Sequence, residues 1–113
     1  MQDTALLKRD RGTTIDDVAI DVQKVCIVTG ASSGLGFETA LKMTALDYDV
    51  ILACRDAHRG NAAVARIQQQ IPECEVCFMQ LDLASLKSTR SFVENFHKTG
   101  KKLHVLINNA GEF

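Results

Sequence analysis

The amino-acid sequence predicts an open α/β fold: a doubly wound parallel sheet of about four strands, with helices on both faces. Three observations support this prediction. Short runs that are apolar almost throughout recur along the chain, a helix-length stretch separates each run from the next, and a glycine-rich run follows the first. Strands that are apolar throughout are typical of parallel sheets covered on both faces, and right-handed crossovers place them in the order 3-2-1-4.

The first unit places a glycine-rich turn between a strand and a helix. Residues 24–29 form the predicted strand, and residues 35–46 form the predicted helix. Between them lies Thr29-Gly30-Ala31-Ser32-Ser33-Gly34-Leu35-Gly36. Backbone N–H groups at a helix start have no internal partners and attract anions, so this turn predicts a phosphate-binding site. An ordinary glycine-containing loop is the alternative.

Each glycine of the turn has its own expected task. Gly30 would allow the tight turn, Gly34 a close backbone approach to phosphate, and Gly36 close packing of helix on strand. Ser32 and Ser33 would add hydroxyl donors to the same site.

The second unit is a short apolar strand over residues 50–54 and a helix that Asp56 caps and that runs through Gln70. Gly60 weakens this helix locally, and Pro72 stops it. Its apolar stripe comprises Ala63, Val64, Ile67 and Ile71.

The third unit is a strand over residues 76–81 and a helix from about residue 84 to residue 98. We expect Leu86, Val93 and Phe96 to form the inward face of this helix, with Phe92 adjacent. Gly100 ends the helix, and residues 103–107 form the fourth strand.

Composition and charge limit the class of protein. A chain of 113 residues, 46% hydrophobic and 24% charged, is typical of one small globular domain. The net charge of −1 gives no attraction to nucleic acid or anionic lipid. No apolar run approaches the roughly 20 residues that span a bilayer, and we expect no transmembrane segment and a cytoplasmic location.

Residues 1–22 differ from the rest of the sequence. Neither helical nor strand periodicity persists there, so we expect a flexible N-terminal extension before a domain over residues 23–113. A partner-docking arm is the alternative.

The cysteines are expected to be structural thiols. Cys26 and Cys54 lie in predicted strands. Cys74 and Cys77 have the spacing of a redox or zinc pair, but no second Cys/His pair accompanies them, and residues three apart in a strand point to opposite faces. The histidines, expected to be structural or surface residues, are His58, His97 and His104.

Polar or glycine residues follow every predicted strand, at the sheet edge where open α/β folds bind ligands. Arg55 follows the second strand, where an acidic residue would receive the ribose hydroxyls of NAD. A planar guanidinium suits the 2′-phosphate of NADP instead. Asp82 and Leu83 follow the third strand, and Asn108-Asn109-Ala110-Gly111 follow the fourth. The alternatives are a surface arginine, a helix cap at Asp82 and an asparagine turn.

These motifs resemble the N-terminal half of a short-chain dehydrogenase/reductase. Thr29-Gly30-x-x-x-Gly34-x-Gly36, Asp82 and the Asn108–Gly111 run carry the resemblance, over about residues 23–111. Residues 51–56 and 81–86 look most like the branch of retinol dehydrogenases, WW-domain oxidoreductases and protochlorophyllide reductases. The resemblance implies a partial, Rossmann-like NAD(P)-binding domain.

The resemblance also implies a role for each strand-end residue. The pyrophosphate would be held by Gly30, Ser32, Ser33, Gly34 and Leu35, with Gly36 in the same motif. Arg55 would select NADP, with NAD the less favoured cofactor. Asp82 would bind the adenine amino group, and Leu83 would back the ring. Asn108 would tie strands together, and the ribose side would be lined by Asn109, Ala110 and Gly111. Ser33 stands where some NADP-using members place a Lys or Arg.

The family's chemistry implies a serine and a tyrosine with a lysine four residues later, which lowers the tyrosine pKa. The single tyrosine, Tyr48, is followed four residues later by Leu52. We therefore expect the cofactor-binding part of an NADP-dependent oxidoreductase acting on an alcohol or carbonyl, such as a retinoid or steroid, without its catalytic residues.

Several alternatives stay open at this point. The chain could be a non-catalytic fragment that binds nucleotide or a partner, a truncated product that does not fold, or a flavodoxin-like domain with a coincidental glycine turn. The fourth strand, residues 103–107, would be an apolar edge, which predicts self-association through that edge.

Overall fold

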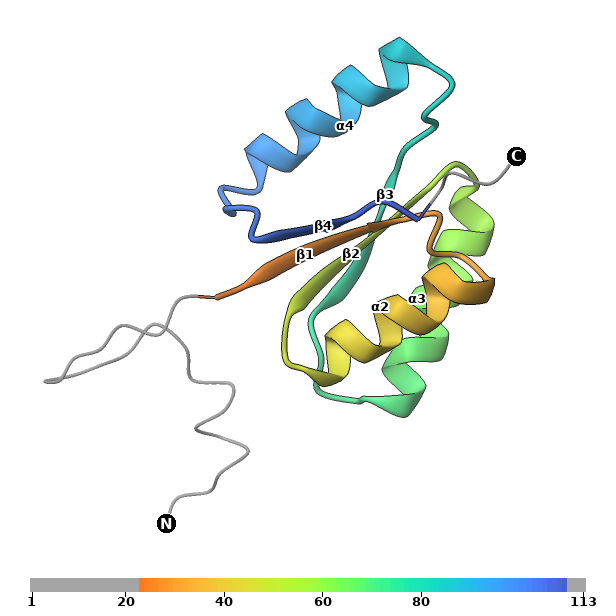
Figure 1. The fold of residues 1–113 in the computed structure, drawn as a ribbon, viewed down its shortest axis with the longest axis vertical. Helices are drawn as coiled ribbons and strands as arrows, with labels where there is room; N and C mark the ends of the chain where they lie inside the picture. The colour runs from red at the N-terminus through yellow and green to blue at the C-terminus, as the bar shows by residue number, and fades with distance from the viewer. Residues whose placement is uncertain (1–22, 110–113) are drawn as a thin grey trace, which may run out of the picture.

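The fold is a four-stranded parallel sheet, seen in a computed structural model that describes residues 23–109 (Figure 1). The strand order is β3-β2-β1-β4, which confirms the prediction. The strands are β1 (Val25–Thr29), β2 (Asp49–Cys54), β3 (Val76–Gln80) and β4 (Val105–Ile107). The helices are α2 (Gly34–Ala45), α3 (Ala57–Gln70) and α4 (Leu86–Lys98). The predicted extension, residues 1–22, lies outside the described residues, as do residues 110–113.

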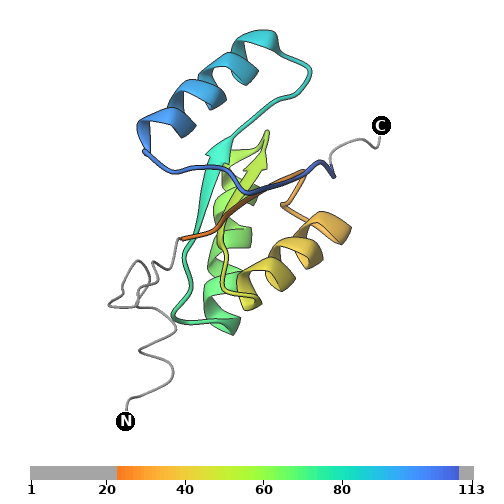
Figure 2. The ribbon, with the colours of Figure 1, turned by 60° about the vertical axis from the view of Figure 1, so that its left-hand side comes forward.

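Helices lie on both faces of the sheet, with α2 and α3 on one face and α4 on the other (Figures 1 and 2). Successive side chains of β1 point to opposite faces of the sheet, so they pack in turn into the two cores on either side of it. Cys26 and Val28 belong to the core shared with α2 and α3, whereas Val25 and Ile27 belong to the core shared with α4. Every residue of β1 and β2 is buried, as their apolar runs predicted.

Helix α3 packs unusually closely on the sheet at Gly60. A Cβ atom at this position would overlap the ring of Phe78 in β3 and would lie 3.0 Å from Sγ of Cys54. Gly60 is buried together with Ala63 and Ile67, which confirms two members of the predicted stripe. Gly60 has a low helix propensity, but its lack of a side chain lets α3 approach β3 closely.

The inward face of α4 differs from the prediction. Phe92 and Phe96 are both buried, whereas Leu86 is 67% exposed and Val93 is 45% exposed. Residues four apart share a helix face, so the two phenyl rings enter the core together. They are the largest apolar groups of α4, and their burial sets the rotation of the helix about its axis.

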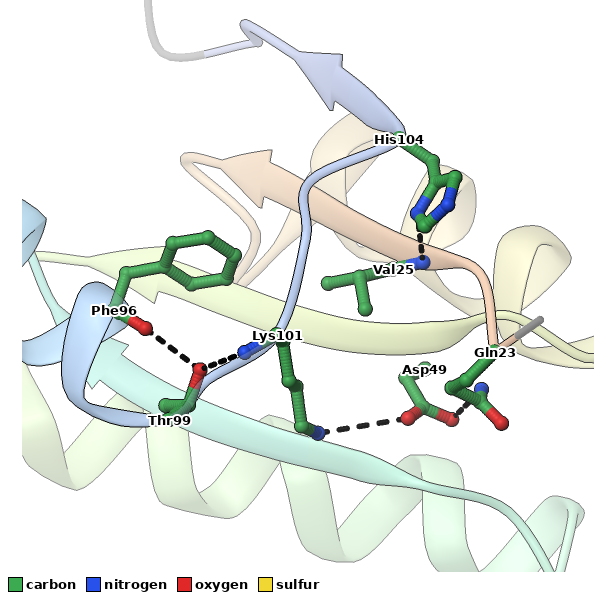
Figure 3. Close-up of polar contacts among 7 residues, drawn as sticks. All are labelled: Gln23, Val25, Asp49, Phe96, Thr99, Lys101 and His104. Carbon is green, nitrogen blue, oxygen red and sulfur yellow. Dashed lines mark hydrogen bonds and ion pairs between the residues drawn. The ribbon is translucent and has the colours of Figure 1, made fainter. Parts of the chain in front are cut away.

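Strand β4 starts later than predicted because a side chain takes the place of a backbone partner. The backbone N–H of His104 donates to the carbonyl of Val25 at 3.0 Å. The ring Nδ1 of His104 accepts the N–H of Val25 at 3.1 Å (Figure 3). The regular ladder begins only at Val105, and Leu103 precedes the strand.

A buried carboxylate ties the amino-terminal ends of the strands together. Asp49 is 5% exposed, accepts a hydrogen bond from Nε2 of Gln23 and pairs with Nζ of Lys101 at 3.5 Å (Figure 3). Lys101 lies in the connection from α4 to β4, so this ion pair fastens that connection to Asp49, the first residue of β2.

Candidate functional site

A cleft of about 420 Å³ lies at the carboxyl ends of β1, β2 and β3. Five of the residues that the sequence predicted as ligands line it: Gly30, Ser32, Arg55, Asp82 and Leu83. The strand ends meet at one edge because the sheet is parallel, so residues far apart in the chain converge there. The convergence is the arrangement that a ligand with several polar groups requires.

The glycine turn gives α2 an open start. Gly30 and Gly34 have φ values of 62° and 60°, which side chains with a Cβ rarely adopt. The N–H of Gly30 donates to the carbonyl of Ala53 at 2.8 Å, so the turn is fastened to β2. The expected tight turn at Gly30 is confirmed.

The start of α2 differs from the starts of α3 and α4. Asp56 caps α3 by accepting the N–H of Arg59, and Ser85 caps α4 by accepting the N–H of Ser88. Ser33, the residue before α2, makes no capping hydrogen bond through its side chain, and no acidic residue lies in the first turn. The partial positive charge of this helix end is therefore not offset by a capping side chain, and an anion would be stabilised there.

Gly36 is where α2 touches the end of the sheet. A Cβ at Gly36 would overlap the carbonyl of Gly30 and would crowd Nδ2 of Asn109. The expected role of Gly36 in close helix–strand packing is confirmed. Nδ2 of Asn109 donates to the carbonyl of Gly30 at 3.3 Å, so the segment that follows β4 holds the turn.

The end of β4 is joined to β1 through one hydroxyl. Oγ1 of Thr29 donates to Oδ1 of Asn108 at 2.9 Å and accepts the N–H of Asn109 at 2.9 Å. The expectation that Asn108 ties strands together is confirmed. Neither Asn108 nor Asn109 lines the cleft, and Ala110 and Gly111 lie outside the described residues.

Asp82 is held in a turn before α4. Its N–H donates to Oγ of Ser88 at 2.8 Å, and its Oδ1 accepts the N–H of Ala84 at 3.0 Å. The residue that caps α4 is Ser85, so the alternative of a helix cap at Asp82 is wrong. Asp82 lines the cleft together with Leu83.

Arg59 is a cleft residue that the sequence did not single out. It lies in the first turn of α3 and lines the cleft together with Arg55 and Asp56. The available signal was its spacing: it follows Arg55 by four residues across the predicted start of a helix. The pKa of the Asp56 carboxyl lies below its usual value, chiefly because the carboxylate accepts a hydrogen bond from the N–H of Arg59.

Two of the four cysteines are buried as structural thiols would be, whereas Cys74 is half-buried and Cys77 is exposed. Cys26 and Cys54 are buried, and burial raises the pKa of the Cys26 thiol to about 11. Burial also raises the pKa of Cys54, which lies in the wall of the cleft. Over residues 23–109 no group of His, Cys, Asp and Glu could hold a metal ion, and no helix is long and apolar enough to cross a membrane.

Residues 24–112 match the family model described as short chain dehydrogenase. The chain is 49% identical over 90 residues to WW domain-containing oxidoreductase of Gallus gallus, covering 80% of this chain and 22% of that protein. It is 48% identical over 88 residues to polyprenol dehydrogenase of Danio rerio, covering 78% and 27%. It is 44% identical over 94 residues to retinol dehydrogenase 12 of Bos taurus, covering 80% and 30%.

Solved structures agree with these relatives. Menthone neomenthol reductase from Mentha piperita matches with a TM-score of 0.76 and 34% identity, over 80% of this chain and 32% of that one. A metagenomic short-chain oxidoreductase in complex with NADP matches with a TM-score of 0.71 and 29% identity, over 80% and 41%. The chain thus spans between about a fifth and a third of the curated relatives. The family model covers most of its length, and the chain belongs to the short-chain dehydrogenase family.

Proposed function

We propose that this chain binds NADP and is the cofactor-binding part of a short-chain oxidoreductase. The observation that carries the proposal is the cleft that brings Gly30, Ser32, Arg55 and Asp82 to one edge of the sheet, beside the uncapped start of α2. Two matched structures are described as bound to NADPH or NADP, each 29% identical to this chain. They support a nicotinamide dinucleotide as the ligand.

The parts of the cleft fit the parts of a dinucleotide. The start of α2 would offer backbone N–H groups to a pyrophosphate, and Ser32, two residues before α2, lines the cleft. Leu83 is 50% exposed and offers an apolar surface for the adenine ring. Asp82 lines the cleft, and its carboxylate would accept a hydrogen bond from the adenine amino group. In the bound protein the nicotinamide ring would supply hydride transfer.

The preference for NADP over NAD rests on charge at the end of β2. Arg55 is exposed and lines the cleft, where its guanidinium would bind two oxygens of a 2′-phosphate. Its neighbour Asp56 already accepts the N–H of Arg59 at 3.1 Å. A carboxylate that caps a helix in this way is less available to the ribose hydroxyls that NAD would present.

Titration calorimetry on the 113-residue chain with 2′,5′-ADP and 5′-AMP tests this preference. We expect 2′,5′-ADP to bind about tenfold or more tightly, since a charge-assisted bidentate pair contributes about 1.5–3 kcal/mol. Arg55→Ala should remove the difference. Arg90→Ala, at an exposed position of α4, is the matched control and should retain it. Equal affinities for the two nucleotides in the unaltered chain would contradict the proposal.

The whole protein's substrate is proposed to be a lipophilic alcohol or its carbonyl product, in the class of retinoids or steroids. Two of the matched relatives are named for dehydrogenation of retinol and of polyprenol, which are both lipophilic alcohols. Reading the coding sequence beyond Phe113 tests the enzymatic part, because a dehydrogenase of this family needs a Tyr-x-x-x-Lys pair. A continuation without that pair would contradict it.

A second proposal concerns the edge of the sheet. Leu106 in β4 is 58% exposed, and the preceding Leu103 is 43% exposed, so the edge strand offers apolar side chains beside unpaired backbone groups. We propose that this chain self-associates through β4. Sedimentation should show a concentration-dependent dimer that Leu106→Lys abolishes and that Leu46→Lys, at an exposed leucine after α2, preserves. A monomer at all concentrations would contradict it.

A further inference from the structure

An apolar groove of about 580 Å³ lies between α4 and β4, on the face of the sheet that α4 covers. Val93 of α4 and Leu106 of β4 line it, as does Leu103 in the connection between the two elements. All three side chains are exposed in the described part of the chain. Apolar side chains gathered in one exposed hollow mark a surface that binds another segment or molecule.

The ionisable side chains that line this groove are basic. Lys101, Lys102 and His97 line it, and among residues 23–109 no Asp or Glu does. Lys101 is paired with Asp49 at 3.5 Å, whereas Lys102, the next residue, is exposed beside it. The groove therefore suits an occupant that combines apolar side chains with carboxylates.

The described part of the chain begins close to this basic end of the groove. Nε2 of Gln23 donates to the Asp49 carboxylate, and the same carboxylate pairs with Lys101 (Figure 3). The residues just before Gln23 are therefore tethered next to the groove. A short tether gives a segment an effective concentration on the order of millimolar at a nearby site, so even a weak contact would be populated.

Residues 13–22 have the composition that the groove requires. They hold three aspartates, no Lys or Arg, and the apolar residues Ile15, Val18, Ala19, Ile20 and Val22. Residues 8–11, Lys-Arg-Asp-Arg, are basic by contrast. Ten extended residues reach about 33 Å, and β1, a strand of five residues beside the groove, spans about 17 Å. The segment is therefore long enough to turn back and cross the groove.

We propose that residues 13–22 of this chain dock in the groove between α4 and β4, with apolar side chains against Val93 and Leu106 and a carboxylate near Lys102. The inference is independent of the cofactor cleft. A second copy of the chain is the other occupant that the exposed leucines would attract, but it lacks the tether. Because the segment would cover Leu106, docking would also compete with self-association through β4.

Nuclear Overhauser contacts between methyl groups of the 113-residue chain test the docking. We expect contacts from Val18 or Ile20 to Val93 or Leu106. Ile20→Asp should remove these contacts and shift the Val93 methyl signals, because a carboxylate is costly to bury among apolar groups. Leu6→Asp, which lies outside the proposed segment, is the matched control and should preserve them.

Cleavage by a protease that cuts before aspartate tests the ionic part. Lys102→Glu should weaken docking and raise the rate of cleavage at Asp16 about twofold to fivefold, the effect of losing an exposed ion pair. Asp17→Lys in that background should recover part of the protection. Lys98→Glu, at an exposed position of α4 that does not line the groove, is the control and should leave the rate unchanged.

Each contrary outcome overturns the docking. Contacts that arise only between labelled and unlabelled chains in a mixed sample would assign the groove to a second copy. Absence of contacts, with Val93 methyl signals that Ile20→Asp leaves in place, would show that the segment lies elsewhere. Equal cleavage rates in Lys102→Glu and Lys98→Glu would remove the basic end of the groove from the account.

Discussion

The hydroxyl of Thr29 donates a 2.9 Å hydrogen bond to Oδ1 of Asn108, which joins the last residue of β1 to the end of β4. The same oxygen accepts the N–H of Asn109 at 2.9 Å. Asn109 in turn donates to the carbonyl of Gly30. One small side chain thus links β4 to the glycine turn.

Removing that hydroxyl should loosen both features. Thr29→Val keeps the shape of a 5% exposed side chain but leaves the N–H of Asn109 and the Asn108 amide without this partner. We expect the free energy of unfolding to fall by about 1–3 kcal/mol, and nucleotide affinity to fall with it. Urea denaturation measures the first change. Thr89→Val is the control that should leave affinity unchanged. The hydroxyl of Thr89 donates to the carbonyl of Ser85, the residue that caps α4.

The glycines of the turn should differ in their tolerance of alanine. Gly34→Ala adds a Cβ into open space, so it should lower the free energy of unfolding only by the strain of a positive φ, about 1 kcal/mol. Gly36→Ala drives a Cβ into the carbonyl of Gly30 and should cost about 1–3 kcal/mol. Thermal melts of the two variants test the ranking. A Gly36→Ala protein as stable as the unaltered chain would contradict the packing described for α2.

Gly60→Ala should reverse the usual effect of this substitution in a helix. Helix propensity alone favours alanine by about 1 kcal/mol, but the added methyl group overlaps the Phe78 ring and should destabilise the chain by about 1–3 kcal/mol. A double-mutant cycle with Phe78→Leu measures the interaction between the two sites. The cost should shrink in the Phe78→Leu background, and an additive cycle would contradict the contact.

The stability that the Asp56 cap gives to α3 should depend on pH. The pKa of Asp56 lies below its usual value, chiefly because the carboxylate accepts the N–H of Arg59. A lowered pKa in the folded state gives stability that is present above the unfolded carboxyl pKa, about 4, and is lost as the pH falls through the folded value. The difference in unfolding free energy between the unaltered chain and Asp56→Ala should therefore shrink only in acid.

Asp56→Asn is the control for that pH dependence. Its side-chain oxygen still caps a helix but does not titrate. The difference between Asp56→Asn and Asp56→Ala should stay constant from neutral pH into acid. A difference that changes with pH for this pair would show that another group causes the effect.

Several features of the fold follow from local patterns in the sequence. The apolar runs of β1 and β2 predict strands buried on both faces, and the alternation with helices fixes the order of strands in the sheet. The glycine spacing predicts the tight turn at Gly30 and the packing at Gly36, because each depends on the backbone of neighbouring residues.

Other features depend on contacts between distant residues and were missed. The rotation of α4, which buries Phe92 and exposes Val93, is set by the core beneath it. The late start of β4 depends on a histidine ring that takes the place of a strand partner. Arg59 lines the cleft from the residue before Gly60, where α3 packs closely on β3. No local pattern in the sequence encodes the rotation of α4 or the contact of the His104 ring, whereas the spacing of Arg59 from Arg55 was a signal that the sequence offered.

Amide chemical-shift mapping of the 113-residue chain during titration with NADP tests most directly whether the cleft at the carboxyl ends of the strands binds the dinucleotide. The shifts should concentrate in two segments, the glycine turn over residues 30–36 and the start of α3 over residues 55–59, and 2′,5′-ADP should reproduce the second set. Absence of shifts in these segments at saturating NADP, or shifts confined to α4 and β4, would contradict the site.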